Sequence, residues 1–393
     1  MIQSNFMEKL LDGVEVEWKT LGEVAEIYGG LSGKSKNDFA DGNALYISYK
    51  NIFDNIEINF DKLESVKVSD SENQHEVKYG DILFTGSSET AEEAGMSSAV
   101  TTKFTNKIYL NSFSFGVRFN DDINITPEFS KYLFRSHFMR VEIAKTASGV
   151  TRFNISKARF KKILIPIPPL KVQEEIVRIL DTFTELTTEL TTELTTRKKQ
   201  YTYYRDKLLS FEEGEVEWKT LGSVVEIQRG KRLVKSELET LGKYAVFQNS
   251  MVPLGYYHKS NVKANTTFII SAGAAGEIGY SNVDFWAADD VYFFLHNNKI
   301  KSKYLYYFLL TQKTKISSQV RRASVPRLSK MVVEKLIIPI PPLLEQERIV
   351  SILDKFDALT SSITEGLPRE IELRQKQYEY YRNMLLSFPK QEV

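Results

Sequence analysis

Residues 161–170 read Lys-Lys-Ile-Leu-Ile-Pro-Ile-Pro-Pro-Leu, and the part from Ile163 onward returns almost unchanged as Leu336–Leu343. The stretch Arg197–Arg205 returns in the same way as Arg374–Arg382, and each copy then closes on Leu-Leu-Ser-Phe. Both markers occur in the same order in the two halves of the sequence. The chain is therefore a tandem duplication.

Between its two markers, the first copy has the spacing of a long helix. Ile176, Ile179 and Phe183 recur at intervals of three and four residues, which is typical of a coiled-coil seam. Pro168–Pro169 fixes the start, because proline is tolerated before or at the first helical turn. The segment Lys171–Phe211 contains no further Gly or Pro. It predicts a helix of about 60 Å.

Residues 184–195 consist of the unit Thr-Glu-Leu-Thr three times over. The leucines predict a core stripe, whereas the exact repetition lets the helix gain or lose length by about one turn at a time. The second copy is four residues longer between its markers, so we expect a longer helix there, which Gly366–Pro368 would kink or break. Four helix-end tyrosines are expected in the coiled-coil core: Tyr201, Tyr204, Tyr378 and Tyr381.

The predicted fold class is α+β, with two mixed α/β domains separated by two long antiparallel coiled-coil helices. Residues 15–22 and 215–222 are identical, so the duplication is circular and has pseudo-twofold symmetry, with termini that should lie near one another. The expected boundaries are 1–14 for the segment completing the repeat, 15–160 and 214–335 for the two domains, and 161–213 and 336–393 for the two helices.

Turn-bounded apolar runs predict strands inside both domains. In the first domain they are Leu45–Tyr49, Ile56–Phe60, Asp81–Thr85, Lys107–Leu110 and Phe113–Phe119, with a helix at Pro127–Lys145. In the second they are Tyr244–Gln248, Thr266–Ser271 and Val291–Leu295, with a helix at Ser302–Thr311. Near-identical helices joined to divergent domains suggest one scaffold carrying two different binding modules.

Composition excludes several chemistries. The chain has no cysteine, which rules out disulfides and thiol catalysis, and its four histidines show no metal-ligand spacing. There is no secretory signal and no apolar run long enough to cross a membrane, so we expect a cytoplasmic protein. The Gly-rich segment at residues 29–35 is too short by one residue for a P-loop, and no methyltransferase, nuclease or hydrolase motif is present. No catalytic constellation therefore stands out in the sequence.

The overall charge of +1 conceals an asymmetry between the domains. Residues 222–335 hold 17 basic and 8 acidic side chains, whereas residues 15–160 hold 17 and 21. Two stretches at equivalent places in the duplication, 143–173 and 291–333, contain basic residues and no acidic ones. A charge run is usually just a solvated face, but this repeated pattern indicates a surface that binds phosphates.

The chain resembles the specificity (S) subunits of type I restriction–modification systems in three features. These are the Pro-Ile-Pro-Pro-Leu phrase at each helix start, the Gln-Tyr-x-Tyr-Tyr-Arg phrase at each helix end, and the segment Ser148–Ser156. The resemblance covers the whole chain and is strongest to the class with tetrapeptide repeats in the central helix. It departs at Phe153, where the common family phrase has proline. The second domain offers only Ser324–Ser329 at this point.

The resemblance implies a non-catalytic subunit of a type I restriction–modification complex. Each domain would be a target-recognition domain that reads one half of a bipartite, asymmetric double-stranded DNA target. The helices would set the spacer and dock two methyltransferase (M) subunits, and two restriction and translocation (R) subunits would join the full complex. No cofactor is expected on this chain, because S-adenosylmethionine, ATP and Mg would bind to the partners. The alternative is a stand-alone nucleic-acid-binding scaffold without restriction partners.

DNA contacts require Arg, Lys, Asn, Gln and Ser at groove edges and phosphates. For each candidate a plain surface role is an equal alternative. In the first domain the candidates are Lys34, Lys36, Ser48, Lys50, Asn51, Arg152, Asn154 and Lys157; in the second they are Arg229, Lys231, Arg232, Gln248, Asn249, Arg321, Arg322 and Arg327.

Overall fold

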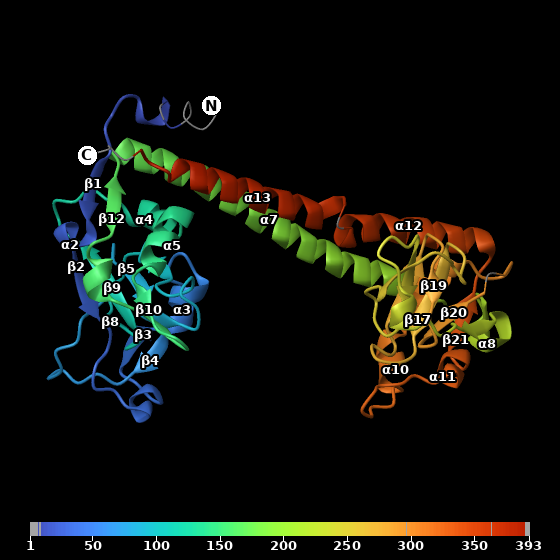
Figure 1. The fold of residues 1–393 in the computed structure, drawn as a ribbon. Helices are drawn as coiled ribbons and strands as arrows, with labels where there is room; N and C mark the ends of the chain where they lie inside the picture. Colours follow the sequence, from blue (N-terminus) through green and yellow to red (C-terminus); the bar gives the residue numbers. More distant parts are fainter. Residues whose placement is uncertain (1–6, 8, 296, 363, 390–393) are drawn as a thin grey trace. The chain divides into compact units, whose positions relative to one another are not determined.

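The computed structural model describes residues 7, 9–295, 297–362 and 364–389. The chain forms two compact units (Figure 1). The first comprises Met1–Glu189 with Glu372–Val393, and the second comprises Leu190–Ile371. Each unit combines one α/β domain with parts of the long helices, as the duplication predicts.

The first unit is built around a four-stranded antiparallel sheet in the order β2-β9-β5-β7, which is accompanied by two three-stranded sheets. Every residue of β5 is buried. Ile82 and Phe84 pack in a core with the helices, whereas Leu83 packs in a second core with β3, because successive side chains point to opposite faces. The strands are β2 (Ala25–Gly29), β9 (Ser114–Phe119), β5 (Ile82–Thr85) and β7 (Ser97–Ala99); β4 (Glu64–Val66), β3 (Ala44–Ile47) and β8 (Ile108–Leu110); and β10 (Ala147–Ser148), β11 (Phe153–Ile155) and β6 (Ser87–Ser88).

Short helices cover this domain. The predicted helix at 127–145 is two helices, α4 and α5, because Ser136 caps the second by accepting a hydrogen bond from the Met139 amide. The predicted strand at 56–60 is wrong: only Glu57 makes an isolated bridge, and a 3₁₀ turn follows. The helices are α2 (Leu21–Val24), α3 (Tyr49–Asp54), α4 (Pro127–Leu133), α5 (His137–Ala144) and α6 (Lys157–Phe160).

The second unit repeats this plan with different side chains. Its four-stranded sheet has the order β14-β20-β17-β18, and a three-stranded sheet has the order β16-β15-β19. Alternation again divides one strand between two cores: Ile269 of β17 faces the helices, and Phe268 and Ile270 face the other side. The elements are β14 (Ile227–Arg229), β20 (Val291–Phe294), β17 (Thr266–Ile270), β18 (Ile278–Ser281), β16 (Gly255–Tyr257), β15 (Tyr244–Phe247), β19 (Trp286–Ala287), α8 (Leu221–Val224), α9 (Ser302–Thr311), α10 (Lys313–Ser318) and α11 (Lys330–Glu334).

A two-stranded ribbon precedes each long helix. In the first unit β1 (Glu17–Thr20) pairs antiparallel with β12 (Leu164–Ile167), and in the second β13 (Glu217–Thr220) pairs with β21 (Ile337–Ile340). The first proline of each Pro-Ile-Pro-Pro phrase lies in the second strand of its ribbon, which is an edge where a missing amide is tolerated. Both repeated phrases thus form the same structure.

The predicted first long helix is α7 (Leu170–Leu208), with 39 residues. The second copy is broken into α12 (Leu343–Ser361) and α13 (Gly366–Leu385), with 19 and 20 residues. The helix does not lengthen as expected, and of the two alternatives for Gly366–Pro368 the structure shows a break, which lies directly before Gly366. Gly366 turns the chain at φ +78°, and an added Cβ would lie 2.4 Å from the Ala358 carbonyl oxygen.

Each unit contains an antiparallel pair of long-helix segments, as Figure 1 shows. Tyr381 of α13 stacks on Phe183 of α7 in the first unit, at 5.2 Å between ring centroids. Tyr204 of α7 stacks on Phe356 of α12 in the second, at 5.6 Å. These two tyrosines contact the partner helix but are 42% (Tyr204) and 37% (Tyr381) exposed, whereas Tyr201 and Tyr378 pack against the cores as predicted. The repeat leucines are less covered than predicted, and Leu186 is 37% exposed.

The circular repeat is visible in the core of the first unit. Met7 and Leu11 pack in one cluster with Leu385 and Phe388, and the Trp18 indole donates a hydrogen bond to the Pro389 carbonyl at 3.1 Å. The N-terminal segment thus lies beside the end of α13. The chain ends themselves, residues 1–6 and 390–393, fall outside the described residues, so their predicted proximity stays a prediction.

Candidate nucleic-acid interface

In the first unit, three loops separated in sequence meet beside β6. Asn154 and Phe153 of β11 pair with Ser87 and Ser88, and the Tyr49 hydroxyl at the start of α3 donates to the Ser87 carbonyl at 2.8 Å. The loops that contain Ser48 and Arg152 are thereby joined. Two candidate regions of the sequence lie at one site.

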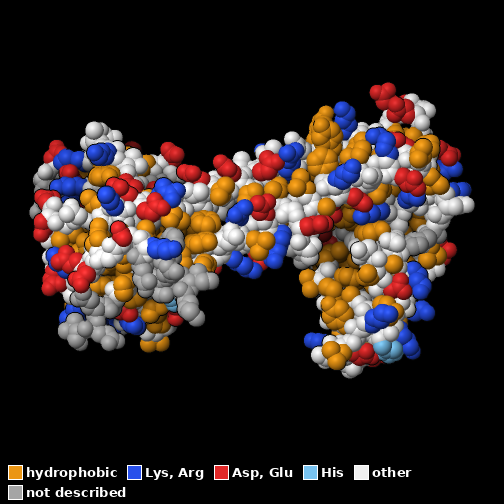
Figure 2. Space-filling model, turned by 90° about the horizontal axis from the view of Figure 1, so that it is seen from above, with side chains coloured by type: hydrophobic (Ala, Val, Ile, Leu, Met, Phe, Trp, Pro, Cys, Tyr) orange, Lys and Arg blue, Asp and Glu red, His pale blue; other side chains and the backbone are white. Residues whose placement is uncertain are grey.

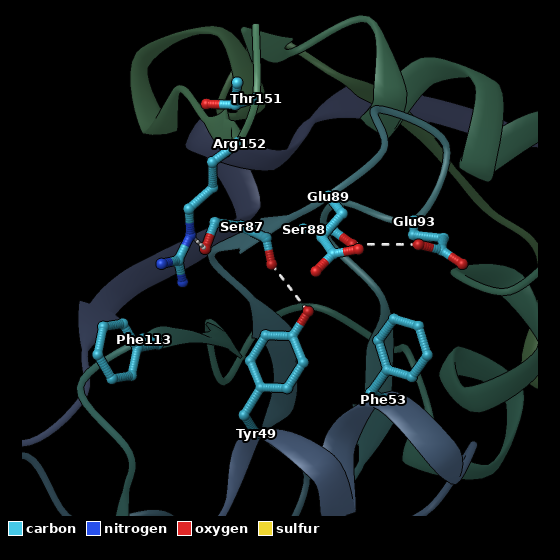
Figure 3. A pocket seen from close by; sticks show the side chains of 9 residues that line it. All are labelled: Tyr49, Phe53, Ser87, Ser88, Glu89, Glu93, Phe113, Thr151 and Arg152. Atoms are coloured by element: carbon cyan, nitrogen blue, oxygen red, sulfur yellow. Dashed lines mark hydrogen bonds between the residues drawn. The ribbon is translucent and has the colours of Figure 1, made fainter. Parts of the chain in front are cut away.

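A cavity of about 580 Å³ lies at this junction (Figure 3). Tyr49 and Phe53 of α3 stack at 5.9 Å and form one wall, and Phe113 and Arg152 lie on the other side of Tyr49. The Ser88 hydroxyl donates to Glu93 at 3.3 Å. The lining residues are Tyr49, Phe53, Ser87, Ser88, Glu89, Glu93, Phe113, Thr151 and Arg152.

The Arg152 guanidinium is held in a fixed orientation. Its Nε donates to the Ser87 hydroxyl at 2.9 Å, and its Cζ lies 5.6 Å from the centroid of the Phe113 ring. The Phe113 side chain is 61% exposed. An exposed aromatic ring beneath an arginine, next to a cavity, suits contact with a base edge or a sugar–phosphate.

Helix α3 is held in place from below by Arg135. Its guanidinium donates to the carbonyls of Ile52, Phe53 and Asn55 at 2.9–3.0 Å, which satisfies the C-terminal end of the helix. Burial lowers the pKa of Arg135 to about 10, but the carbonyl contacts surround the guanidinium with acceptors. The position of Tyr49 thus depends on a half-buried cation that contacts the far end of its helix.

Two candidate residues of the first domain face inward. Asn51 is 3% exposed, and its amide contacts the backbone of Asn59 through both the nitrogen and the oxygen. The Lys34 ammonium is 2.5 Å from Glu72, and its side chain is 5% exposed. In this structure neither side chain is available to DNA. The polar character of Asn51 and Lys34 did not reveal that both side chains bond to groups within their own domain.

The other candidates of the first domain lie at or near the surface. Lys36, Lys50, Asn154 and Lys157 are exposed, and Ser48, at the N-terminus of α3, is half-buried. Lys157 lies over the Phe115 ring at 5.7 Å, and the Asn154 amide donates to the Arg152 carbonyl at 3.4 Å. Asn154 therefore belongs to the Arg152 site.

The second unit brings its candidates together in the same way. The Ala274 amide donates to the Asn249 carbonyl at 2.8 Å, and the Gly273 amide donates to the Pro326 carbonyl at 3.1 Å. Arg321 and Arg327 bond each other through their backbones at 2.9 and 3.1 Å, so they bracket a turn that carries Arg322. All three arginines and Asn249 are exposed, and Gln248 is half-buried.

The β-bridges show how the loops of the two domains correspond. In the first domain Asn154 pairs with Ser148 on one side and Ser87 on the other. In the second domain Arg327 takes the place of Asn154, because it bridges Arg321 on one side and Ala272 on the other. Pro326 therefore occupies the place of Phe153. The proline of the family phrase, missing from the first domain, is present in the second.

The remaining candidates of the second domain form a separate group. Arg229, the last residue of β14, is exposed, as are Lys231 and Arg232 on the following loop, and Arg229 Nε donates to the Asp289 carbonyl at 2.5 Å. The Lys231 carbonyl accepts from the Trp286 indole at 3.0 Å. Figure 2 shows Lys and Arg side chains on the visible face of this unit, interspersed with other types. These three exposed cations contribute to the positive charge at the surface of the domain.

Sequence reasoning did not identify Phe113, Glu89, Glu93 or Lys259, which line surface cavities in the two units. The sequence signal for Phe113 was an aromatic residue beside Asn and Ser at the start of a predicted strand.

Among the described residues, no cluster of three or more His, Asp or Glu could hold a metal ion. None of the described helices has the length and hydrophobicity that a bilayer-spanning segment requires.

The sequence matches the model of one protein family, described as the type I restriction modification DNA specificity domain, at residues 13–197 and 213–373. The chain belongs to this family. The two matches correspond to the two α/β domains with their long helices, so the chain carries two specificity domains.

Relatives and solved structures match the chain along nearly all of its length. It is 35% identical to the EcoR124I/EcoR124II specificity subunit of Escherichia coli, covering 100% of this chain and 99% of that protein. It is 34% identical to a putative specificity subunit of Haemophilus influenzae, covering 98% of both. The fold resembles the S subunit of M. genitalium, with a TM-score of 0.57 at 19% identity, covering 97% of this chain and 98% of that one. The fold also resembles a structure from a study of type I complex assembly, with a TM-score of 0.63 at 17% sequence identity, covering 95% of this chain and 98% of that one.

Proposed function

We propose that this chain is the DNA specificity subunit of a type I restriction–modification complex and that each specificity domain reads one half of a split DNA target. The observation that carries the proposal is the repeated architecture with divergent loops. The same two sheets occur in both units, yet the loop site holds Ser87, Phe113 and Arg152 in one and Asn249, Arg321 and Arg327 in the other. Two different surfaces on one scaffold suit an asymmetric target.

The chain itself does no chemistry in this proposal. Two methyltransferase subunits dock on the long helices, and two restriction subunits complete the assembly in the cytoplasm. S-adenosylmethionine, ATP and Mg bind to those partners. The comparisons give no support to the alternative of a stand-alone nucleic-acid-binding scaffold, because the relatives quoted above bear the names of restriction-system specificity subunits.

The test is to produce the chain with its methyltransferase partner and to map methylated adenines across a genome by single-molecule sequencing. We expect a motif of two short half-sites around a fixed gap. A continuous motif, or no methylation from a complex shown to be intact, would overturn the two-domain reading model. Methylation by a complex without this chain would show that the sequence specificity resides elsewhere.

A further inference from the structure

The two units carry a surface pocket at equivalent places on their smaller sheets. Each has a volume of about 600 Å³. Strands β3 and β15 are equivalent, and their first residues are Ala44 and Tyr244. The third residue of β3 pairs with Tyr109, and the third residue of β15 pairs with Trp286. Ala44 and Tyr109 line the pocket of the first unit, and Tyr244 and Trp286 line the pocket of the second. The two pockets can therefore be compared position by position.

The pocket over β15 is basic. Arg229, Lys231 and Lys259 line it, and none of the ten described lining residues is acidic. Among the described residues, no Asp or Glu forms an ion pair with any of these three cations. Glu239 lies outside the lining and is bonded to Nδ1 of the lining residue His258 at 2.5 Å. Asp284, also outside the lining, accepts from the Ser260 hydroxyl at 3.4 Å, so among the described residues no carboxylate is paired with the three cations.

The pocket over β3 has the opposite character. Asp70, Glu72 and Glu76 line it, together with a single cation, Lys107. That lysine is 2.9 Å from Glu76, while Glu72 is paired with Lys34. A phosphate placed here would meet three carboxylates, so the pocket disfavours an anion.

We propose that the pocket over β15 binds a phosphodiester of the DNA backbone and that its counterpart over β3 does not. The proposal rests on the DNA-binding function inferred above and adds a contact that is independent of base sequence. Unpaired Lys and Arg side chains attract phosphates and release the counterions that surround DNA. The indole of Trp286, fixed by its bond to the Lys231 carbonyl, offers a flat wall for the adjoining sugar.

The consequence is a division of labour between the domains. The second domain holds the DNA backbone at an additional point, whereas the first relies on the loop site beside Arg152. Because backbone binding is electrostatic, the second domain supplies the larger share of the salt-dependent affinity. The three cations of this pocket are part of the excess of basic residues in residues 222–335.

The experiment measures binding of the complex with its methyltransferase subunits to a fluorescent duplex of scrambled sequence, by anisotropy over a range of salt concentrations. A scrambled duplex contains no recognised target, so the result does not depend on whether the half-site model is right. Lys231→Ala and Lys259→Ala change side chains that are exposed, whereas Arg229 is left in place because it supports the Asp289 carbonyl. We expect each variant to make the negative slope of log K against log salt shallower by about 0.9, and to reduce affinity by about 8-fold near 0.1 M salt.

The matched control is Lys107→Ala in the equivalent pocket of the first domain, which should leave the slope unchanged. A duplex that contains the mapped target should lose affinity in the same proportion as the scrambled one. Unchanged slopes in both lysine variants, with the complex assembled normally, would overturn the proposal. A loss confined to the target duplex would also overturn it, because that result would indicate base reading.

Discussion

The side chain of Gln173 bonds the backbone of Thr126 across 47 residues of sequence. Its Oε1 accepts from the Thr126 amide at 2.9 Å, and Gln173 is fully buried. Its Nε2 donates to the carbonyls of Asn124 at 2.6 Å and Pro168 at 2.8 Å. One amide therefore ties the first turn of α7 to the segment that leads into α4.

The second unit repeats the arrangement with Gln346. Its Oε1 accepts from the Lys301 amide at 2.8 Å, and its Nε2 donates to the carbonyls of Lys299 and Pro341, each at 2.9 Å. This glutamine is also fully buried. The third residue after each Pro-Pro-Leu phrase thus joins its helix to its own domain.

Gln173→Ala should destabilise the first unit by about 3–5 kcal/mol, because it leaves an amide and two carbonyls without partners as well as a small cavity. Urea unfolding and amide hydrogen exchange at Thr126 would measure this. Gln346→Ala should have the same effect on the second unit. The exposed neighbour Glu174→Ala serves as the control, and continued exchange protection of Thr126 in Gln173→Ala would contradict the prediction.

A second link in each unit is a tyrosine–aspartate bond. The hydroxyls of Tyr132 and Tyr307 donate to Asp181 and Asp354, both at 2.5 Å, and burial raises the pKa of each tyrosine. Tyr307→Phe should lower the free energy of unfolding by about 1.5–3 kcal/mol, which is the typical contribution of a hydrogen bond to a charged group. Chemical denaturation of this variant, Asp354→Asn and the double variant would measure the coupling. Fully additive single effects would show that the bond contributes nothing.

The Gly-rich loop of the first domain should respond to acid. The Lys34 ammonium, the Gln74 amide and the Ser69 backbone amide hold the pKa of Glu72 at about 2, below its ordinary value of 4.5. Because the folded pKa is the lower one, the stabilisation is present above pH 4.5 and is lost as pH falls from 4.5 toward 2. Proteolysis of this loop should accelerate over that window, and Glu72→Gln should remove the pH dependence.

Arg152→Ala should weaken the contact of the first domain with DNA by about 1–3 kcal/mol. Arg152→Lys should restore little, because lysine cannot both donate to Ser87 and present a planar fork. Methylation efficiency of the complex at mapped sites is the measurement. Val325, which is 47% exposed at the equivalent place in the second domain, provides the control Val325→Ala, for which no change is expected. Full activity of Arg152→Ala would remove this residue from the interface.

Deleting one Thr-Glu-Leu-Thr unit from residues 184–195 removes about 6 Å of helix. Since a base pair advances about 3.4 Å along DNA, the gap of the target should shorten by about one or two base pairs, with both half-sites unchanged. Methylome mapping of the deletion variant is the measurement. An unchanged gap with full activity, or an altered half-site, would contradict the proposed role of the repeat.

The sequence by itself determined the duplication, the first long helix and the fold class. These follow from local patterns: apolar residues at intervals of three and four in 171–211, and a proline phrase that starts each helix. Helix Ser302–Thr311 was predicted to the residue. The difference in charge between the two domains was also predictable, because it follows from counting acidic and basic residues in the sequence.

Tertiary structure decided which polar side chains remain available. Asn51 and Lys34 resembled surface contacts but bond within their own domain, whereas Phe113 was overlooked and is exposed beside Arg152. The Ser87–Arg152 bond spans 65 residues, and no local pattern encodes such a pairing. It arises because strand register places distant loops side by side, and register is set by the burial of the whole sheet.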